Sequence, residues 1–279
     1  MQFKTVTLNG LNIFFREDGD PAKPTFLLLH GFPTSSHMFR NLMPLLAHDF
    51  HVLAPDYIGF GRSSAPNHQD FDYTFANQTK YVSDFLHILH VQKFYLYVFD
   101  YGAPIGFDIA DHMPDKVLGI VSQNGNIYEE GLGKKWAARK AYWQHPTPQL
   151  REKFKAAFSP EAIKRQYLTG EKPGSVGPDG LTLDIHYTES PDYAERQSDL
   201  IFDYQTNLKN YPRFQSYLRA FKPDLIAAWG RNDESFVYQG ALAFAKDDPN
   251  VDIHLLNGGH FVLESHYREI AQLILNKWA

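Results

Sequence analysis

The sequence contains no cysteine among its 279 residues. Disulfides, cysteine metal sites and thiol catalysis are therefore excluded together. Long apolar runs are lacking as well, because the longest are about six residues, far short of the roughly 20 that span a bilayer. The first residues, MQFKTVTLNG, contain no apolar segment of the kind found in a secretory signal. We therefore expect a cytoplasmic protein with no membrane partner.

An excess of positive charge is also lacking. The chain carries 27 Lys and Arg against 32 Asp and Glu, a formal net charge of −5. Neither nucleic acid nor an anionic membrane surface is therefore expected as a partner. No His, Asp or Glu spacing indicates a metal site, and no Gly-x-Gly-x-x-Gly motif follows the early apolar runs, so we expect no metal and no cofactor. The composition leaves the oligomeric state open, a homodimer included.

Short apolar runs bounded by turn residues alternate along the chain with amphipathic stretches at helical spacing. The apolar runs are residues 25–29, 51–54, 94–99, 117–122, 225–229 and 251–256. The amphipathic stretches include residues 38–46, 81–90 and 105–110. Ahead of them, Asn9-Gly10 interrupts an alternating segment, as in a β-hairpin turn. This order predicts an α/β fold, with a mostly parallel, twisted sheet covered by helices on both faces.

The alternation stops near Glu129 and resumes near Phe221. The intervening segment contains helical stretches, a Gly- and Pro-rich stretch (GEKPGSVGPDG, 170–180) and no clear strand. The helical stretches are residues 134–144, 148–158, 160–168 and 193–207. We therefore predict a core formed by residues 1–128 and 219–279, with a helical cap, residues 129–218, inserted after the sixth strand.

Polar residues that can carry chemistry follow three of the apolar runs. In VFDYGAPIG (98–106), Asp100 stands where a strand would turn into a helix, the position of a nucleophile elbow. Asp233 follows a later run in AAWGRNDESF, and His260 follows the last run in LLNGGHFVLE. Each residue taken alone is compatible with an ordinary turn. Together, and in the order nucleophile, acid, base, they favour a catalytic triad.

With these motifs the core resembles the α/β-hydrolase fold, and the Asp at the elbow resembles its epoxide hydrolase and haloalkane dehalogenase branches. No Gly-x-Ser-x-Gly occurs in the chain, so a serine esterase would lack its nucleophile. The resemblance implies that Asp100 attacks an sp³ carbon and forms an alkyl ester. Water activated by His260, whose tautomer Asp233 fixes, would then hydrolyse that ester.

The resemblance also implies an oxyanion hole and a set of residues around the substrate. Its donors would be the backbone N–H groups of Tyr101 and of Phe32, the third residue of the His-Gly-Phe-Pro motif. His30, the first residue of that motif, is expected to orient the loop. Trp143 and other aromatic residues of the cap are expected to line the site, which favours a small apolar substrate.

The cap sequence favours an epoxide over an alkyl halide. Dehalogenases typically place Trp after the nucleophile and Asn or Trp at a second site, where this chain has Tyr101 and Phe32. Epoxide hydrolases use two cap Tyr hydroxyls directed at the epoxide oxygen. AYWQHPTPQL (141–150) resembles the first of their motifs and assigns this role to Tyr142. FDYQTNLKNYPRF (202–214) resembles the second and assigns it to Tyr204.

Two alternatives remain open. Val98, two residues before the predicted nucleophile, is typical of haloalkane dehalogenases, which use the same triad, whereas epoxide hydrolases have Gly-His in place of Val98-Phe99. The same unusual pair is also compatible with a non-catalytic, ligand-binding α/β-hydrolase. For the acid, Glu129 and Glu130 lie near the position that one dehalogenase subgroup uses, although Asp233 is the preferred candidate.

Overall fold

The computed structural model describes all 279 residues, and its centre is one eight-stranded sheet with the order β1-β2-β4-β3-β5-β6-β7-β8. β2 pairs antiparallel with β1 and with β4, whereas all other pairs are parallel. Each predicted apolar run forms a strand. The strands are β1 (Gln2–Leu8), β2 (Leu11–Asp18), β3 (Thr25–Leu29), β4 (His51–Pro55), β5 (Phe94–Phe99), β6 (Val117–Gln123), β7 (Leu225–Gly230) and β8 (Asp252–Leu256).

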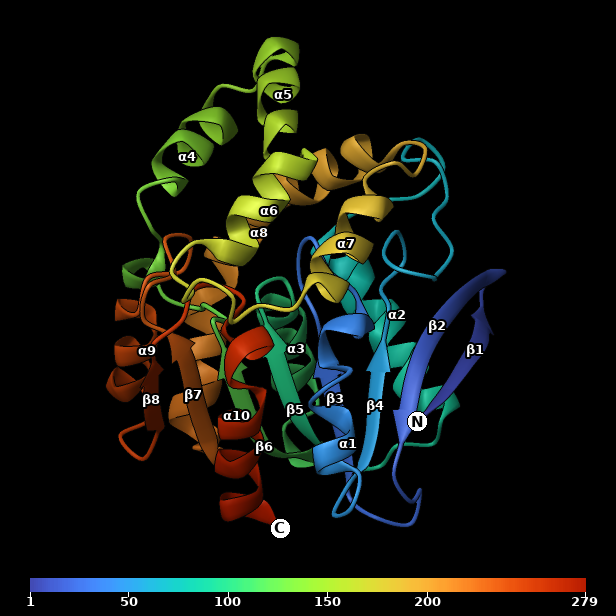
Figure 1. The fold of residues 1–279 in the computed structure, drawn as a ribbon, viewed down its shortest axis with the longest axis vertical. Coiled ribbons are helices and arrows are strands. Elements are labelled where there is room, and N and C mark those ends of the chain that lie inside the picture. Colours follow the sequence, from blue (N-terminus) through green and yellow to red (C-terminus); the bar gives the residue numbers. More distant parts are fainter.

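Helices cover both faces of this sheet (Figure 1). On one face lie α1 (Met43–Leu46) and α10 (Val262–Trp278), which pack against each other. On the other lie α2 (Phe75–Ile88), α3 (Gly102–His112) and α9 (Gln239–Ala243). The central strands are apolar on both sides, because Leu96 and Val98 of β5 belong to one core while Tyr97 and Phe99 belong to the other. The predicted α/β fold is confirmed.

Local sequence explains the first turn and one broken helix. Asn9 and Gly10 both have positive φ, 51° and 80°, as the tight hairpin between β1 and β2 requires. The stretch 38–46, predicted as one helix, is instead a 3-10 helix at Ser36–Phe39 followed by the short α1. Pro44 stands in the first turn of α1, and a continuous helix would have needed its missing N–H as a donor.

A group of helices lies between β6 and β7 in the sequence. In space these helices lie above the carboxyl ends of the strands (Figure 1). They are α4 (Trp136–Gln144), α5 (Pro148–Phe154), α6 (Pro160–Leu168), α7 (Pro178–Tyr187) and α8 (Tyr193–Phe221). α5 and α6 begin at N-caps whose hydroxyls accept backbone N–H groups: Thr147 from Leu150 and Ser159 from Ala162. α7 was not predicted, although Pro178 at its first position is a typical helix start.

The last of these helices belongs to the cap and to the core at once. α8 runs without a break through residue 218, the predicted boundary, and ends at Phe221. It packs against α2 and α3 of the core as well as against α4. The cap is thus joined to the core by a continuous helix on this side. None of the helices is both long and apolar enough to cross a membrane.

Candidate active site

The predicted nucleophile lies at a sharp turn between β5 and α3. Asp100 has a φ of 49°, in the left-handed region, and its side chain is buried. The turn depends on two glycines. A Cβ at Gly31 would lie 2.4 Å from Cβ of Asp100, and a Cβ at Gly102 would lie 2.3 Å from the carbonyl oxygen of Leu29. The local sequence therefore forms a strained elbow that only small neighbours allow.

Two backbone N–H groups hold one carboxylate oxygen of Asp100. The N–H of Phe32 donates to Oδ1 at 2.8 Å, and the N–H of Tyr101 donates to the same atom at 2.6 Å. These are the two groups that the sequence predicts for the oxyanion hole. They leave Oδ2 as the oxygen available for attack, and they are placed to stabilise negative charge on Oδ1.

His30 lies beneath the oxyanion loop. Burial lowers its pKa to about 4, so the ring is neutral at physiological pH. The ring stacks on Tyr57 with centroids 4.1 Å apart, and its Nε2 accepts the backbone N–H of Tyr57 at 3.3 Å. The Tyr57 hydroxyl donates to the carbonyl oxygen of His30 at 2.8 Å. These contacts fix the loop that carries Phe32 and make His30 a positioning residue.

His260 lies between the two carboxylates predicted with it. Its Nδ1 is 2.7 Å from Oδ2 of Asp233, and its Nε2 is 3.5 Å from Oδ2 of Asp100. Burial by itself lowers the pKa of His260, but the charge of Asp233 and the hydrogen bonds to Asp100 and Asp233 raise it to about 10. Glu129 and Glu130, the alternative acids, instead pair at the surface with Lys140 and Lys246.

Asn124, which the sequence analysis did not assign to the site, holds the acid in place. Its Nδ2 donates to Oδ2 of Asp233 at 2.8 Å, and its Oδ1 accepts the backbone N–H of Gly230 at 2.9 Å. The backbone N–H of Ser235 donates to the other Asp233 oxygen at 2.7 Å. Asn124 directly follows β6, the strand between those of Asp100 and Asp233, and this placement is the sequence signal that could have identified it.

Val98 and Phe99, the unusual pair before Asp100, both find space in the structure. Val98 packs where Gly106 of α3 offers space, since a Cβ on Gly106 would lie 2.4 Å from Cγ1 of Val98. Phe99 points to the other face of the sheet, where its ring lies 4.8 Å from that of His260 and 5.2 Å from that of Phe261. The glycine that relieves crowding is thus on the helix rather than on the strand.

The structure separates the two predicted cap tyrosines. Tyr204 is fully buried, and its ring lies 6.0 Å from that of Tyr101, the residue after Asp100. Its hydroxyl is 3.2 Å from the hydroxyl of Tyr211, which in turn is 3.3 Å from Nδ2 of Asn126.

Tyr142 packs elsewhere in the cap, with its ring 5.1 Å from Phe154 and 5.5 Å from Phe202. The Tyr142 ring thus contacts aromatic rings other than those around Tyr204, and a pair of hydroxyls opposite Asp100 stays a prediction. Trp143, the next residue, does lie on the side of Tyr204: the two rings are nearly parallel, with centroids 6.5 Å apart.

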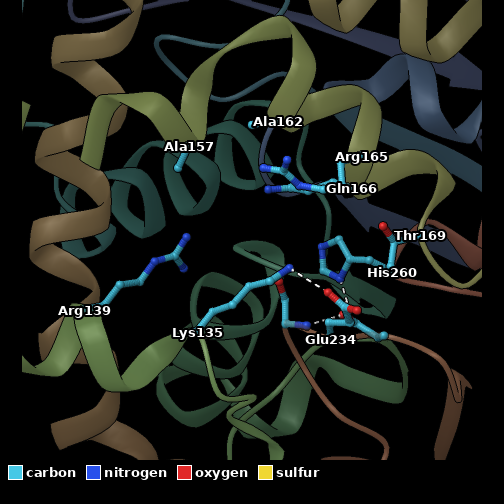
Figure 2. Close-up of a pocket in the computed structure, with 11 residues that line it drawn as sticks. Lys135, Arg139, Ala157, Ala162, Arg165, Gln166, Thr169, Glu234 and His260 are labelled. Carbon is cyan, nitrogen blue, oxygen red and sulfur yellow. Dashed lines mark hydrogen bonds and ion pairs between the residues drawn. The ribbon is translucent and has the colours of Figure 1, made fainter. Parts of the chain in front are cut away.

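A pocket with a volume of about 100 Å³ lies beside the predicted triad, and its lining includes Asp233 and His260 but not Asp100 (Figure 2). Its rim includes the exposed side chains of Lys135, Arg165 and Glu234, and its lining reaches His260. Arg139 of α4 points into this pocket from the side opposite His260 (Figure 2). No sequence motif indicated a role for Arg139.

Taken together, the site holds a carboxylate with one free oxygen, a buried base tied to a second carboxylate, and two fixed N–H donors. This arrangement can form a covalent intermediate on Asp100 and activate water against it. No group of three or more His, Asp and Glu side chains is placed to hold a metal ion.

Comparison with known proteins gives the same family. The family model for the alpha/beta hydrolase fold matches residues 24–267. An uncharacterized hydrolase of Saccharomyces cerevisiae is 41% identical over 97% of this chain and 94% of its own length. A haloalkane dehalogenase of Mesorhizobium japonicum is 36% identical over 90% of this chain and 83% of its own.

Among solved structures, the haloalkane dehalogenase DbeA from Bradyrhizobium elkani superimposes with a TM-score of 0.80, covering 99% of this chain and 97% of that one at 23% identity, a likeness of fold. With its mostly parallel sheet and the family match over most of its length, this chain belongs to the α/β-hydrolase family and is a hydrolase with relatives named haloalkane dehalogenase.

Proposed function

We propose that the protein hydrolyses epoxides to diols through a covalent ester on Asp100. The observation that carries this proposal is the Tyr204 hydroxyl. Burial, the neighbouring Tyr211 and the charge of Asp100 raise the pKa of Tyr204 well above its usual range, so the hydroxyl stays protonated and acts as a donor. When Tyr211 donates to Tyr204, the hydrogen of Tyr204 is free for a substrate oxygen, which is what an opening epoxide requires.

The first step forms the ester. Oδ2 of Asp100 attacks one epoxide carbon and the C–O bond to that carbon breaks. The electron pair goes to the epoxide oxygen, which takes the proton of Tyr204. Oδ1, held by Phe32 and Tyr101, becomes the carbonyl oxygen of the ester.

The second step releases the diol. Once Asp100 is esterified its negative charge is gone, so one of the interactions that raise the pKa of His260 disappears and the ring can lose its proton. His260 then takes a proton from water, and the resulting hydroxide attacks the ester carbonyl carbon at Asp100. The ester bond breaks, the departing alkoxide takes the proton from His260, and the acid proton left on Asp100 returns to Tyr204 through solvent.

The indole N–H groups near the site argue against halide as the leaving group. Haloalkane chemistry needs weakly acidic N–H donors around an anion. Trp136 donates its N–H to the carbonyl oxygen of Ser235, and Trp143 donates to that of Ile201, both at 3.0 Å. Both donors are already satisfied by the backbone.

A haloalkane dehalogenase is the second candidate, and one observation favours it. The relative from Mesorhizobium japonicum, which matches this chain over 90% of its length, carries that name. Halide release from short alkyl bromides, abolished in Asp100→Asn, would support this candidate over the first.

Trapping the ester tests the proposed function directly. His260→Gln cannot activate water, so incubation with a panel of small neutral and anionic epoxides should raise the protein mass by the mass of one epoxide. The double variant His260→Gln/Asp100→Asn is the matched control and should show no increase. If no epoxide gives either an adduct or a diol, the proposed function is wrong.

Tyr204→Phe distinguishes the leaving groups. We expect it to slow epoxide opening by about a hundredfold or more, because general acid catalysis contributes on this order. Opening of an alkyl bromide needs no proton and should change little. Tyr142→Phe is measured alongside, and a loss as large as that of Tyr204→Phe would restore the predicted pair of tyrosines.

A further inference from the structure

Arg139 is a cation placed beside the active site without any partner in the protein. Its side chain makes no hydrogen bond and no ion pair, and its guanidinium lies over the Trp136 ring, 4.7 Å from Cζ to the centroid. Burial lowers the pKa of Arg139, while Tyr101, Asp100 and Tyr204 lie close enough to oppose that effect. Asp100 is the carboxylate whose charge opposes the effect of burial on the pKa of Arg139.

Other sheltered arginines in this chain have hydrogen-bond partners: the buried Arg196 has no carboxylate partner, but it donates to Oγ of Ser190 and to the carbonyl oxygen of Pro191. Arg40 forms a two-pronged pair with Glu264, and Arg151 pairs with Glu195 and Asp199. A cation removed from water without a partner is unfavourable. A residue kept in that state next to the reacting groups indicates that its partner arrives with the substrate.

The geometry of the pocket shows where that partner would sit. Arg139 and His260 lie on opposite sides of the pocket, and the guanidinium of Arg139 points into the space between them (Figure 2). Lys135, the other nearby cation from α4, is paired with Glu234 at 3.2 Å. Arg139 on α4 and Arg165 on α6 are the unpaired cations that line this pocket, and Arg139 is the less exposed of the two.

We propose that the substrate carries a carboxylate that binds the Arg139 guanidinium, so that the substrate class is small epoxides bearing a carboxylate. This rests on the proposed epoxide hydrolysis and narrows it. Arg presents parallel N–H donors that match a carboxylate in a two-pronged hydrogen bond. The pocket volume of about 100 Å³ is small for a ligand site and suits a short epoxy acid.

In this proposal Arg139 offsets the repulsion between Asp100 and the substrate carboxylate. Asp100 is an anion, so it repels a substrate carboxylate that must come within a few bonds of it. A cation on the far side of the substrate offsets this repulsion and orients the epoxide carbon towards Oδ2 of Asp100. The aromatic residues of the cap predict an apolar substrate, and Arg139 adds an anionic end to that prediction.

The test compares glycidate with glycidamide, which differ only in whether the group next to the epoxide is a carboxylate or a neutral amide. Wild-type protein should turn over glycidate with a kcat/KM about tenfold or more above that for glycidamide. Arg139→Gln should abolish this preference by lowering kcat/KM for glycidate alone, and Arg139→Lys should keep part of it. Lys140→Gln, one residue along α4 and paired with Glu129, makes the same charge change away from the pocket and is the control.

Other outcomes overturn the proposal in distinguishable ways. An equal loss on both substrates in Arg139→Gln would mean that Arg139 assists the epoxide oxygen or the fold rather than a carboxylate. Wild-type protein without preference for glycidate would also refute it. If neither epoxide is opened, the wider epoxide panel decides the proposed function, and calorimetric titration with propanoate against propanamide decides the anion site by itself. Propanoate binding lost in Arg139→Gln supports the anion site, and no propanoate binding to wild-type protein refutes it.

Discussion

Near His260, Asn124 holds its position in the site through hydrogen bonds to residues that are distant in the sequence. Asn124 binds Asp233 and the backbone of Gly230, more than a hundred residues away, through both ends of one amide. Its φ of 46° is one that Asn tolerates better than most residues. The amide thereby directs Oδ2 of Asp233 towards Nδ1 of His260, which favours the tautomer that the proposed mechanism requires.

Removal of this amide should slow one step only. In Asn124→Gly, which keeps the left-handed backbone accessible, we expect hydrolysis of the Asp100 ester to slow by about tenfold to a hundredfold, because a hydrogen bond to a charged group is lost. Ester formation should proceed at nearly the wild-type rate. Single-turnover quenched-flow measurements separate the two steps, and an equal slowing of both would contradict a positioning role for Asn124.

At the scale of elements, the phase of α4 decides which aromatic and cationic residues face the site. Trp136, Arg139 and Trp143 recur at helical spacing, and their side chains lie towards Tyr204 or the pocket. Tyr142 is one residue off this face and therefore packs against Phe154 of α5. A sequence motif gives the position of Tyr142 along the chain. The direction of its side chain follows from the rotation of about 100° per residue around the helix axis.

A prediction about stability follows from the contact between Val98 of β5 and Gly106 of α3. Replacing Gly by Ala inside a helix normally raises the free energy of unfolding by about 1 kcal/mol. In Gly106→Ala the new Cβ would meet Cγ1 of Val98 at 2.4 Å, so we expect a loss of about 1–3 kcal/mol in the free energy of unfolding instead.

The cause can be isolated with two further variants. Val98→Ala combined with Gly106→Ala should recover most of the lost stability, because the clashing methyl group is removed. Gly177→Ala is the control, since a Cβ there meets nothing within 4 Å and its φ is −70°. Urea denaturation measures all four proteins, and a stabilised Gly106→Ala would show that the elbow is not tightly packed.

At the scale of the whole molecule, the site couples stability to pH through His260. Its pKa in the folded protein is about 10, against 6.5 as the ordinary value, because Asp233 and Asp100 outweigh the effect of burial. A His with a raised pKa contributes stability fully below its unfolded pKa, and that contribution is lost as the pH rises through the folded value.

We therefore expect the stability difference between wild-type protein and His260→Gln to change with pH. The free energy of unfolding of the wild-type protein, relative to the variant, should be greatest near pH 6 and should decline between about pH 6.5 and about pH 10. Denaturant titrations of both proteins across this window measure it. A difference that is constant over the window would mean that the two carboxylates do not raise the pKa of His260.

Local patterns were sufficient for the fold and for the order of the triad. Each apolar run became a strand because strand formation depends on a short stretch of apolar residues bounded by turns. Asn9-Gly10 formed its hairpin, and Asp100 formed its elbow, because both conformations are set by residues adjacent in sequence. Asp233 and His260 met Asp100 because the carboxyl ends of neighbouring parallel strands share one edge of the sheet.

Only the tertiary structure decided what surrounds the triad. The free guanidinium of Arg139, the separation of Tyr142 from Tyr204 and the amide of Asn124 all depend on how the cap helices and loops pack on the core. Those contacts join residues far apart in the chain, and their side-chain directions follow from packing rather than from any short motif. The sequence by itself therefore determined the order of Asp100, Asp233 and His260 along the strands, while the tertiary structure decided which side chains lie around them.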